Sequence, residues 1–452
     1  MTDYIKELYK VLGKGKVKDA KEYLITHSYD GMRRKFLPDV VVFPESTRDV
    51  VEIVNIASKH KITITPRGAG TGMTGGALPL NGGILISFSK MNRIIKISVD
   101  DTIAIVQPGV VTYDLVKEVE KYGLFYPPDP ASYKTSTIGG NVAENAGGPH
   151  CFKYGITKNY VLGLEAVLMN GEIVKTGGKT IKNVVGYNLT DLLIGSEGTL
   201  AIITEITLKL IPKPKFSGVA RLGFRSLGEA VKGVNKIITN GFFPSALEFM
   251  DKVSIIEVFK FLGLKVNENI SAYLILEFDG DREEVENQLE EIKALFTNEE
   301  LEEIVYATDP EEKERIWEIR RNISGAVSKP DLIKYNEDIV VPRSRLPEIV
   351  DFVYQLGKEY NVKTVLFGHI GDGNIHTNFF VKKEQEIFIE ELLEKLFKKV
   401  IDLGGALSGE HGIGIAKKRF INYQLSPEIV EIHRQIKKIF DPENLLNPGK
   451  IF

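Results

Sequence analysis

Cysteine is almost absent from the sequence, and long apolar runs are missing. The only cysteine, Cys151, excludes an intramolecular disulfide and an iron–sulfur cluster held by this chain alone, because such clusters need several thiolates. No stretch approaches the roughly 18 apolar residues of a membrane-spanning helix. The opening segment "MTDYIKELYKVLGKGKVKDAKEYL" lacks the apolar core of a signal peptide. These absences predict a cytoplasmic protein that depends on another protein for any one-electron relay.

An excess of charge of either sign is also lacking. The 58 Lys and Arg residues nearly balance the 61 Asp and Glu residues, so the composition does not indicate a nucleic-acid partner. Hydrophobic residues make up 43% and charged residues 26% of the chain, which is typical of a soluble globular protein. At 452 residues the chain is too long for one ordinary core, so we expect two domains or more.

Strand patterns dominate the first half of the chain. The segments "DVVVFP", "STRDVVEIVNIASKHK" and "ITITP" predict a β-α-β unit whose helix is capped at Ser46, with Asp49 completing a capping-box-like pattern. From Ile84 to about Leu210, short β-branched runs alternate with long Gly/Pro loops. This part should therefore consist of strands with few helices.

A change of pattern near residue 214 indicates a domain boundary. "IPKPKFSG" places two prolines in a basic polar stretch, and beyond it strands such as "SAYLILEF" alternate with charged amphipathic helices. The alternation predicts an antiparallel α+β sandwich with helices on one face. We expect an α+β protein with a helical lead-in at 1–34, a first domain at 35–214 and a second domain at 215–452.

Three glycine-rich stretches interrupt the predicted first domain. "PRGAGTGMTGGALP" contains Gly70, Gly72 and Gly75 at dinucleotide-fingerprint spacing, but no helix pattern opens at its last glycine and Ile95 stands where an acidic residue is needed. "TSTIGGNVAENAGGPHCFKYG" and "LLIGSEGTLA" are the other two. Because glycine loops expose backbone N–H groups that can wrap a pyrophosphate, three of them predict an extended dinucleotide. Tight hairpin turns would explain any one of them alone.

The stretch "GHIGDGNIH" places two of the chain's 7 histidines around glycines. Strand-like runs on both sides predict a hairpin with a four-residue loop at 371–374. In that register Ile370 pairs with Ile375 and His369 lies opposite His376, with Cβ atoms roughly 5 Å apart. Two imidazoles at that separation can bind one metal ion. The alternative is a pair of polar residues that only flank a turn.

A second glycine-framed turn, in "GALSGEHGIGIAKK", supplies a carboxylate and a third histidine. Catalytic divalent metals commonly take two His and one carboxylate and keep a position open for substrate. His369, His376 and Glu410 fit that set, which leaves His411 beside the metal as a candidate general base. The alternative, a solvated turn, leaves the glycine frame unexplained.

In chain order, these motifs resemble a known family. The stretches "PRGAGTGMTGG", "PPDPAS", "TIGGNVAENAGG", "GSEGTL", "IWEIRR", "GHIGDGNIH", "GEHGIG" and "FDPENLLNPGKIF" are similar to those of the vanillyl-alcohol-oxidase type of FAD flavoprotein. The similarity is closest to the branch that contains the glycolate oxidase flavin subunit, D-lactate dehydrogenase and D-2-hydroxyglutarate dehydrogenase. It covers nearly the whole chain from about residue 35.

The resemblance implies an FAD-binding first domain, a substrate-binding second domain and a C-terminal segment that returns to the flavin. Non-covalent FAD is expected, because the first glycine loop holds no His and Cys151 lies past the "NAGG" glycines of the second loop. The matching motifs place these residues near the cofactor: Pro66, Arg67, Gly68, Ala69, Gly70, Thr71, Gly72, Gly75, Gly76, Pro128, Asp129, Ser136, Thr137, Gly139, Gly140, Asn141, Asn145, Gly147, Gly148, Glu197, Gly198, Thr199 and Asn447.

In the second domain the resemblance implies a metal-assisted oxidation. His369, His376 and Glu410 match the family's metal ligands, with Zn²⁺ expected and Mn²⁺ or Fe²⁺ as alternatives. His411 matches the catalytic base, and Arg320 matches the arginine that binds the substrate carboxylate through its planar fork. The residues expected to assist substrate binding are Ser324, Lys334, Asn336 and Asn378.

One departure from the family pattern favours a short substrate. Relatives that act on dicarboxylates carry a Lys in a "KYD"-like run before a Pro. Counting back from Pro342, Asn336 takes the Lys position and Lys334 lies two residues earlier on the same strand face. The expected activity is FAD-dependent oxidation of glycolate or D-lactate to the 2-oxo acid. D-2-hydroxyglutarate dehydrogenase and a flavoprotein subunit active only within a larger complex are the alternatives.

The electrons must then leave the flavin for an acceptor outside the chain. With one cysteine and no convincing NAD fingerprint, we expect an iron–sulfur partner subunit or a quinone-linked acceptor, the latter at the inner face of the membrane. The oligomer is left open, with a homodimer as one option. A flavin-free metallohydrolase has no use for the glycine loops. The non-redox ether-lipid synthase of the superfamily carries consecutive histidines where this chain has "EHG".

Overall fold

The computed structural model describes residues 2–452, which divide into two compact units. The first unit comprises residues 2–147, 156–213 and 410–452, and the second comprises residues 148–155 and 214–409. No helix among the described residues is long and apolar enough to cross a bilayer.

A small sheet with a covering helix opens the first unit, after α1 (Asp3–Leu12). The sheet contains, in spatial order, β1 (Val17–Lys18), β2 (Val40–Val42), β4 (Ile84–Ser87) and β3 (Ile64–Arg67), and α2 (Lys21–Thr26) lies between β1 and β2 in the chain. The helix α3 (Thr47–His60) begins where the Asp49 N–H donates to the Ser46 Oγ at 3.2 Å. Because β2 and β3 both run parallel to β4, the predicted β-α-β unit is confirmed, with β4 between its two strands.

A five-stranded antiparallel sheet completes the first unit's framework. Its order is β5 (Ile94–Ser98), β6 (Ile103–Val106), β10 (Ile202–Lys209), β8 (Val161–Val167) and β9 (Ile173–Gly177). The β-branched runs seen in the sequence form these strands. The unit also contains α4 (Thr112–Glu120), the paired strands β7 (Leu124–Phe125) and β11 (Ile211–Pro212), α14 (Ile421–Gln424) and α15 (Pro427–Phe440).

The prediction that the second glycine stretch is a loop is wrong in part. Its residues Ile138–Glu144 form the helix α5, which begins after Thr137, whose Oγ1 accepts a hydrogen bond from the Gly140 N–H at 3.3 Å. A Cβ at Gly139 would overlap Pro108. This glycine therefore allows a helix to pack closely against a neighbouring segment, whereas we had expected it to open a turn.

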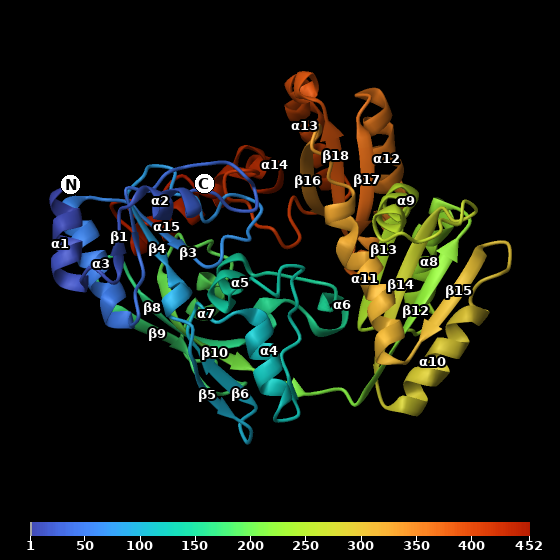
Figure 1. The fold of residues 1–452 in the computed structure, drawn as a ribbon, viewed down its shortest axis with the longest axis horizontal. Helices are drawn as coiled ribbons and strands as arrows, with labels where there is room; N and C mark the ends of the chain where they lie inside the picture. Colours follow the sequence, from blue (N-terminus) through green and yellow to red (C-terminus); the bar gives the residue numbers. More distant parts are fainter. Residues whose placement is uncertain (1) are drawn as a thin grey trace. The chain divides into compact units, whose positions relative to one another are not determined.

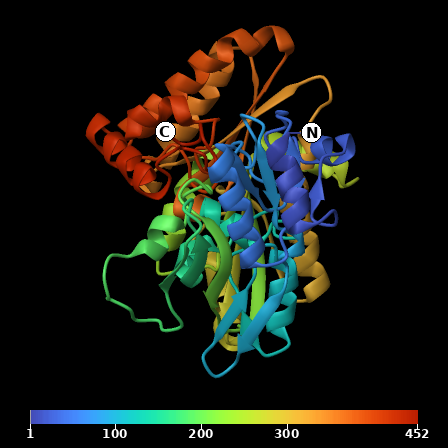
Figure 2. The same cartoon turned by 90° about the vertical axis from the view of Figure 1, so that its left-hand side faces the viewer.

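Between β9 and α7 (Leu189–Leu193) the chain forms a loop that extends away from the five-stranded sheet, drawn in green in Figure 2. Its apolar side chains are almost fully exposed, with values of 76% for Ile181, 96% for Val184, 90% for Val185 and 95% for Tyr187. The loop therefore adds nothing to the core. It leads through α7 directly into the third glycine stretch.

The second unit is built on one sheet of seven strands, which is antiparallel as predicted (Figure 1). Its strands in spatial order are β15 (Leu301–Ala307), β12 (Phe216–Phe224), β14 (Ala272–Gly280), β13 (Ala246–Asp251), β17 (Lys363–Gly368), β18 (Asn374–Val381) and β16 (Ile333–Val340). Its helices are α6 (Cys151–Tyr154), α8 (Leu227–Thr239), α9 (Lys252–Phe261), α10 (Arg282–Ala294), α11 (Pro310–Ala326), α12 (Leu346–Glu359) and α13 (Glu386–Asp402).

Helices cover both faces of this sheet, so the prediction of one covered face is wrong. On one face, Val219 of β12 shares a core with Ile255 of α9 and Ile319 of α11. On the other, a Cβ at Gly218 would lie 2.6 Å from Leu289 of α10. Adjacent strand residues point to opposite faces, so these contacts lie on opposite sides. The amphipathic pattern of a helix does not indicate which face of the sheet the helix will cover.

A buried carboxylate joins three elements of the second unit. Asp251, with no exposed surface, ends β13 and caps α9 by accepting the Ser254 N–H at 2.7 Å. Its Oδ2 also accepts the Tyr354 hydroxyl of α12 at 2.6 Å and the Leu366 N–H of β17 at 2.7 Å. Burial raises the pKa of Asp251, and these hydrogen bonds oppose that effect. The carboxylate thus fixes β17 three residues before His369.

We expect Asp251→Ala to lower the free energy of unfolding of the second unit by about 3–5 kcal/mol, because a helix cap is lost and two buried donors are left unpaired. The single tryptophan, Trp317, lies in α11, so urea unfolding followed by its fluorescence reports on this unit. Tyr354→Phe, which removes one of the bonds, should cost about 1 kcal/mol. If Asp251→Ala also cost only about 1 kcal/mol, the role of the carboxylate would be contradicted.

Candidate active site

The two histidines of the 368–376 stretch lie at the turn between β17 and β18. The hairpin is confirmed, but its predicted register is wrong, since His376 pairs with Phe367 and not with His369. A 3-10 turn at Ile370–Asp372 follows His369, whose carbonyl accepts the Asn374 N–H at 3.2 Å. His369 is therefore the first residue after β17 and lies outside the pairing of β17 with β18.

Glycine is required at two positions of this turn. Gly373 has a φ of 87°, and a Cβ there would overlap the Val341 carbonyl oxygen. At Gly371 a Cβ would lie 2.9 Å from the Leu247 Cβ and 3.0 Å from Phe152. The glycines thus let the turn fold against neighbouring backbone, which brings the two imidazoles together.

The two imidazoles face each other with their Nε2 atoms 3.5 Å apart. Two nitrogens at about 2.0–2.1 Å from a tetrahedral Zn²⁺ lie roughly 3.4 Å apart, so this spacing suits one shared ion. A carboxylate oxygen of Glu410 joins them, and all three ligand atoms lie within 4.8 Å of one another. The preceding N–H, of Gly409, donates to the Asp338 Oδ2 on β16 at 2.8 Å. The geometry therefore fits the predicted ligand set.

A carboxylate that the sequence reading missed supports this pair. Glu248 of β13 is fully buried, with Oε1 2.6 Å from the His369 Nδ1 and Oε2 2.5 Å from the Arg320 Nε. Burial alone would raise the pKa of Glu248, but the charge of Arg320 and the hydrogen bonds from Arg320 and His369 outweigh it and hold that pKa below its ordinary value. One signal was available, because "SALEFMD" places an acidic residue inside an otherwise apolar strand.

The predicted substrate residues gather on the face of the sheet that α11 covers. Ser324 lies one turn after Arg320 on α11, and the Lys334 Nζ donates to the Ser324 Oγ at 3.0 Å. The Arg320 Cζ and the Lys334 Nζ lie 5.1 Å and 6.0 Å from the centre of the same ring, that of Phe367. Two cations thus lie near the two histidines that could hold a metal ion.

Asn336 and Asn378 face each other across β16 and β18. They share the sheet face with Lys334 and His376, because alternate strand residues point to one side. The Asn378 amide donates to the backbone carbonyls of Val365 and His376, but the Oδ1 atoms of both asparagines are buried without a partner among the described residues. These oxygens are available to a bound molecule.

In the first unit, the first glycine stretch lies against a buried arginine. Arg67 is 7% exposed, and its Nη1 has no partner among residues 2–452. Gly70 has a φ of 72°, and a Cβ there would overlap the Arg67 guanidinium. A buried cationic donor beside exposed glycine backbone fits the pyrophosphate of FAD, since arginine forks match phosphate oxygens.

Most other residues predicted near the cofactor lie close to this arginine's loop or to one another. A Cβ at Gly68 would overlap the Thr137 Oγ1, so the first two glycine stretches touch. Asn141 donates to the Thr112 Oγ1 at 2.8 Å, which in turn lies 3.1 Å from the Ser136 Oγ. Pro128 and Asp129 follow β7, and Asn145 ends α5 with a φ of 53°. Gly148, by contrast, belongs to the second unit.

The C-terminal segment ties the glycine stretches of the first unit together. The ammonium of Lys450, another residue that the sequence reading missed, donates to the carbonyls of Gly75 at 2.6 Å and Leu78 at 2.7 Å. Burial lowers the pKa of Lys450 to about 8. The Asn447 amide donates to the Gly76 and Glu197 carbonyls at 2.9 and 2.8 Å. The first and third stretches are therefore held in fixed relation.

The side chain of Glu197 fixes the turn that carries His411. Its two carboxylate oxygens accept the N–H groups of Ile413 and Gly414, each at 2.7 Å. Burial raises the pKa of Glu197. The His411 carbonyl accepts the Thr74 hydroxyl at 3.1 Å, and the His411 Nε2 lies 3.9 Å from the Glu410 Oε1. The Glu197 carboxylate therefore organises the candidate catalytic turn, and its place near the cofactor stays a prediction.

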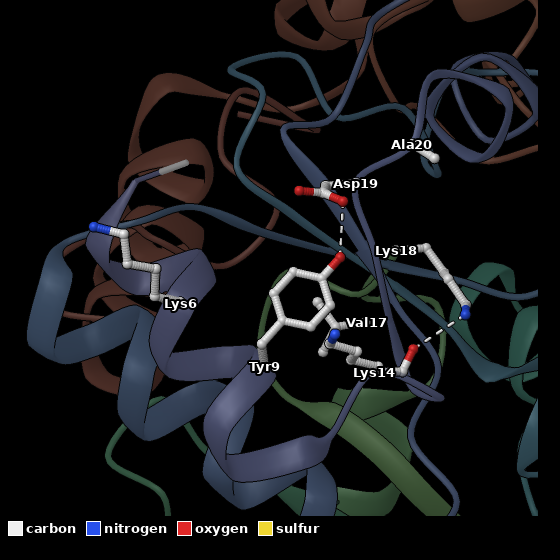
Figure 3. Close-up of a pocket in the computed structure, with 7 residues that line it drawn as sticks. All are labelled: Lys6, Tyr9, Lys14, Val17, Lys18, Asp19 and Ala20. Atoms are coloured by element: carbon white, nitrogen blue, oxygen red, sulfur yellow. Dashed lines mark hydrogen bonds between the residues drawn. The ribbon is translucent and has the colours of Figure 1, made fainter.

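A separate hollow lies near the N-terminus of the first unit (Figure 3). The Tyr9 hydroxyl donates to the Asp19 Oδ1 at 2.7 Å within it, and the Lys18 Nζ donates to the Lys14 carbonyl at 3.1 Å. None of the residues predicted for catalysis or binding lines it. We assign it no role.

Known proteins match the chain over its full length. Residues 213–451 match the family described as FAD linked oxidases, C-terminal domain, and residues 38–177 match the FAD binding domain. The glycolate oxidase subunit GlcD of Bacillus subtilis (strain 168) is 38% identical over 454 residues, which cover 100% of this chain and 97% of that protein. The D-lactate dehydrogenase of Anaerostipes hadrus is 38% identical over 437 residues, which cover 94% and 92%.

Solved structures share the fold at lower identity. A p-cresol methylhydroxylase with substrate bound matches with a TM-score of 0.81 and 18% identity, over 99% of this chain and 96% of that chain. An alkyldihydroxyacetonephosphate synthase matches with a TM-score of 0.77 and 20% identity, over 99% and 84%. At such identities the likeness concerns the fold alone, and the predicted fold class is confirmed.

We expect His369→Ala and His376→Ala each to abolish stoichiometric binding of Zn²⁺ while leaving FAD bound, because the predicted site assigns both imidazoles to one ion and the first and third glycine stretches lie in the other unit. The double variant should lose no more metal than either single one, since residues that share one ligand site do not act additively. Metal analysis after gel filtration, with flavin absorbance on the same sample, measures both. His27→Ala, at the end of α2, is the control. Full metal content in either single variant would contradict the shared site.

Proposed function

Because the chain belongs to the family of FAD-linked oxidases and is an oxidoreductase of the glycolate oxidase and D-lactate dehydrogenase type, we propose that it oxidises glycolate or D-lactate to the corresponding 2-oxo acid. The observation that carries this choice of substrate class is the pairing of Arg320 with the two-histidine site through Glu248. An arginine beside a metal site suits a molecule whose carboxylate and hydroxyl lie on adjacent carbons.

Arg320 binds the substrate carboxylate. Its Nε–H is already donated to Glu248, so the two Nη atoms at the end of the guanidinium remain for the two carboxylate oxygens. Ser324 and the buried Oδ1 of Asn378 are the neighbouring polar groups that orient the rest of the molecule. A carboxylate held by the Nη fork is also held against rotation, because both of its oxygens are engaged.

His369, His376 and Glu410 bind a divalent ion, which we propose to be Zn²⁺, with Mn²⁺ or Fe²⁺ as alternatives. When bound, such an ion acidifies a hydroxyl that coordinates it. His411 takes the hydroxyl proton as general base, since it follows Glu410 in the chain and its turn is anchored by Glu197. The proton therefore ends on the His411 imidazole, from which it passes to solvent.

Arg67 and the glycine stretches of the first unit bind FAD without a covalent bond, because the first stretch contains no His or Cys and Cys151 lies in α6 of the second unit. When bound, FAD accepts the hydride from the substrate Cα. Loss of the hydroxyl proton and the Cα hydride leaves a C=O bond, so the product is the 2-oxo acid. The Lys450 and Asn447 contacts hold the first stretch in its shape for this binding.

The electrons pass on to an acceptor outside this chain. The single cysteine cannot form an iron–sulfur relay, and the Bacillus subtilis relative is named as a subunit of glycolate oxidase. We propose a partner subunit with iron–sulfur centres or a quinone-linked acceptor, with the protein in the cytoplasm or at the inner face of the membrane. Activity only within such a complex, and a homodimeric form of this chain, are the alternatives.

We expect glycolate or D-lactate to bleach the flavin absorbance of the purified protein under anaerobic conditions, because hydride reaches FAD without the partner. L-lactate serves as the stereochemical control and NAD⁺ as the acceptor control. Bleaching should be lost in His411→Asn and kept at lower apparent affinity in Arg320→Lys, since Lys cannot form the bidentate pair. Failure of every 2-hydroxy acid to reduce the flavin would exclude the proposed activity, and absence of flavin would favour a metallohydrolase.

One observation favours a second candidate, D-2-hydroxyglutarate. The Lys334 ammonium contacts Ser324 and lies near the same Phe367 ring as Arg320, where it would suit a second carboxylate. Lys334 therefore separates the two substrate classes.

We expect Lys334→Ala to leave the KM for glycolate or D-lactate within about twofold and to raise the KM for D-2-hydroxyglutarate ~10-fold or more, since a charge-assisted hydrogen bond contributes roughly 1.5–3 kcal/mol. Steady-state dye reduction measures both. Lys329→Ala, which breaks an ion pair with Glu257, is the matched control. Equal changes for both substrate classes would place Lys334 outside the binding site.

A further inference from the structure

We propose that Glu248 is a positioning residue that sets the metal ligand His369 and the carboxylate-binding Arg320 in one fixed relation, so that the two halves of the site are built on a single side chain. This inference rests on the proposed function for the role of Arg320. The contact between Glu248 and His369 does not depend on that function, because it is given by the geometry alone.

Glu248 is fully buried at the centre of the second unit's sheet. It lies on β13, whose next residue, Phe249, pairs with Gly368 immediately before His369. One oxygen contacts the His369 Nδ1 at 2.6 Å and the other contacts the Arg320 Nε at 2.5 Å. Each partner comes from a different element, the turn after β17 and the helix α11.

The contact with His369 decides which ring nitrogen can bind a metal. A carboxylate accepts hydrogen bonds and has none to donate, so the His369 Nδ1 must carry the proton. The lone pair is then on Nε2, the atom that faces the His376 Nε2 at 3.5 Å. A metal-binding histidine oriented in this way typically loses 10–100-fold in metal affinity when its supporting group is removed.

The contact with Arg320 decides which edge of the guanidinium is free. Because the guanidinium is planar, a bond to Nε fixes the whole plane and directs the Nη atoms away from Glu248. The same carboxylate also supplies the counter-charge for an arginine that is 8% exposed. Without it, a buried charge would be left uncompensated, which is costly in the interior.

An amide of the same shape cannot replace this carboxylate. In Glu248→Gln, one carboxylate oxygen becomes an NH₂ group, which would meet either the Arg320 Nε–H or the His369 Nδ1–H, donor against donor. One of the two partners must therefore lose its hydrogen bond. Removing the arginine as well should resolve the conflict, because the single amide oxygen can then serve His369.

The test measures Zn²⁺ affinity by competition with a chelating dye, on FAD-loaded protein first stripped of metal, in the absence of substrate. If the amide oxygen in Glu248→Gln faces Arg320, we expect Zn²⁺ binding to weaken 10–100-fold. If that oxygen faces His369, we expect Zn²⁺ binding to persist and the KM for the hydroxy acid to rise at least tenfold. FAD content should not change. The double variant Glu248→Gln/Arg320→Gln should recover Zn²⁺ affinity to within a few-fold of wild type while its KM stays high, and it also avoids the uncompensated arginine if the single variant folds poorly.

Glu277→Gln is the matched control. Glu277 lies on the neighbouring strand β14, is largely buried and accepts the Trp317 indole N–H at 2.8 Å, so it undergoes the same isosteric change away from the metal ligands. We expect its Zn²⁺ affinity and KM to match wild type.

Unchanged Zn²⁺ affinity and unchanged KM in Glu248→Gln would overturn the inference, as would wild-type protein that binds no Zn²⁺. A protein that oxidises no 2-hydroxy acid but shows the Zn²⁺ effect would contradict the proposed function and keep the role of Glu248 toward His369.

Discussion

Buried carboxylates must be matched by hydrogen-bond donors, and this constraint fixes the geometry of the candidate site. Burying an ionised carboxylate costs several kcal/mol unless charges and hydrogen bonds compensate for it. Glu248 meets the requirement with His369 and Arg320, and Asp251 meets it with α9, α12 and β17. Glu197 meets it with the turn after His411. Each of these side chains therefore connects, through its hydrogen bonds, segments that are distant in sequence.

The sequence predicted most of what depends on local pattern. The β-α-β unit, the antiparallel second unit and the hairpin around His369 and His376 follow from residue periodicity and turn chemistry, and the motifs identified the family. The predicted register of the hairpin was wrong, because composition does not distinguish a 3-10 turn after His369 from a four-residue loop. The helix α5 was missed because its glycines serve close packing, which depends on Pro108, a residue outside the motif.

The remainder of the site depends on contacts over long sequence separations. Glu248 lies 72 residues from Arg320 and 121 from His369, and Lys450 lies 375 residues from Gly75. No local pattern links such partners, although an acidic residue within an apolar strand and a lysine in an otherwise apolar tail were visible. The sequence also did not predict which face of the sheet each amphipathic helix covers, because a helix with one apolar stripe can pack on either face.

The chain passes between its two units four times, at 147/148, 155/156, 213/214 and 409/410. A cut at the boundary near residue 214 would therefore not yield two complete halves. The N-terminal fragment would lack residues 410–452, including the lysine that closes its first glycine stretch, and the C-terminal fragment would lack residues 148–155. Joining two separate gene segments end to end would give a single crossing, so this arrangement of the chain differs from a simple fusion of two modules.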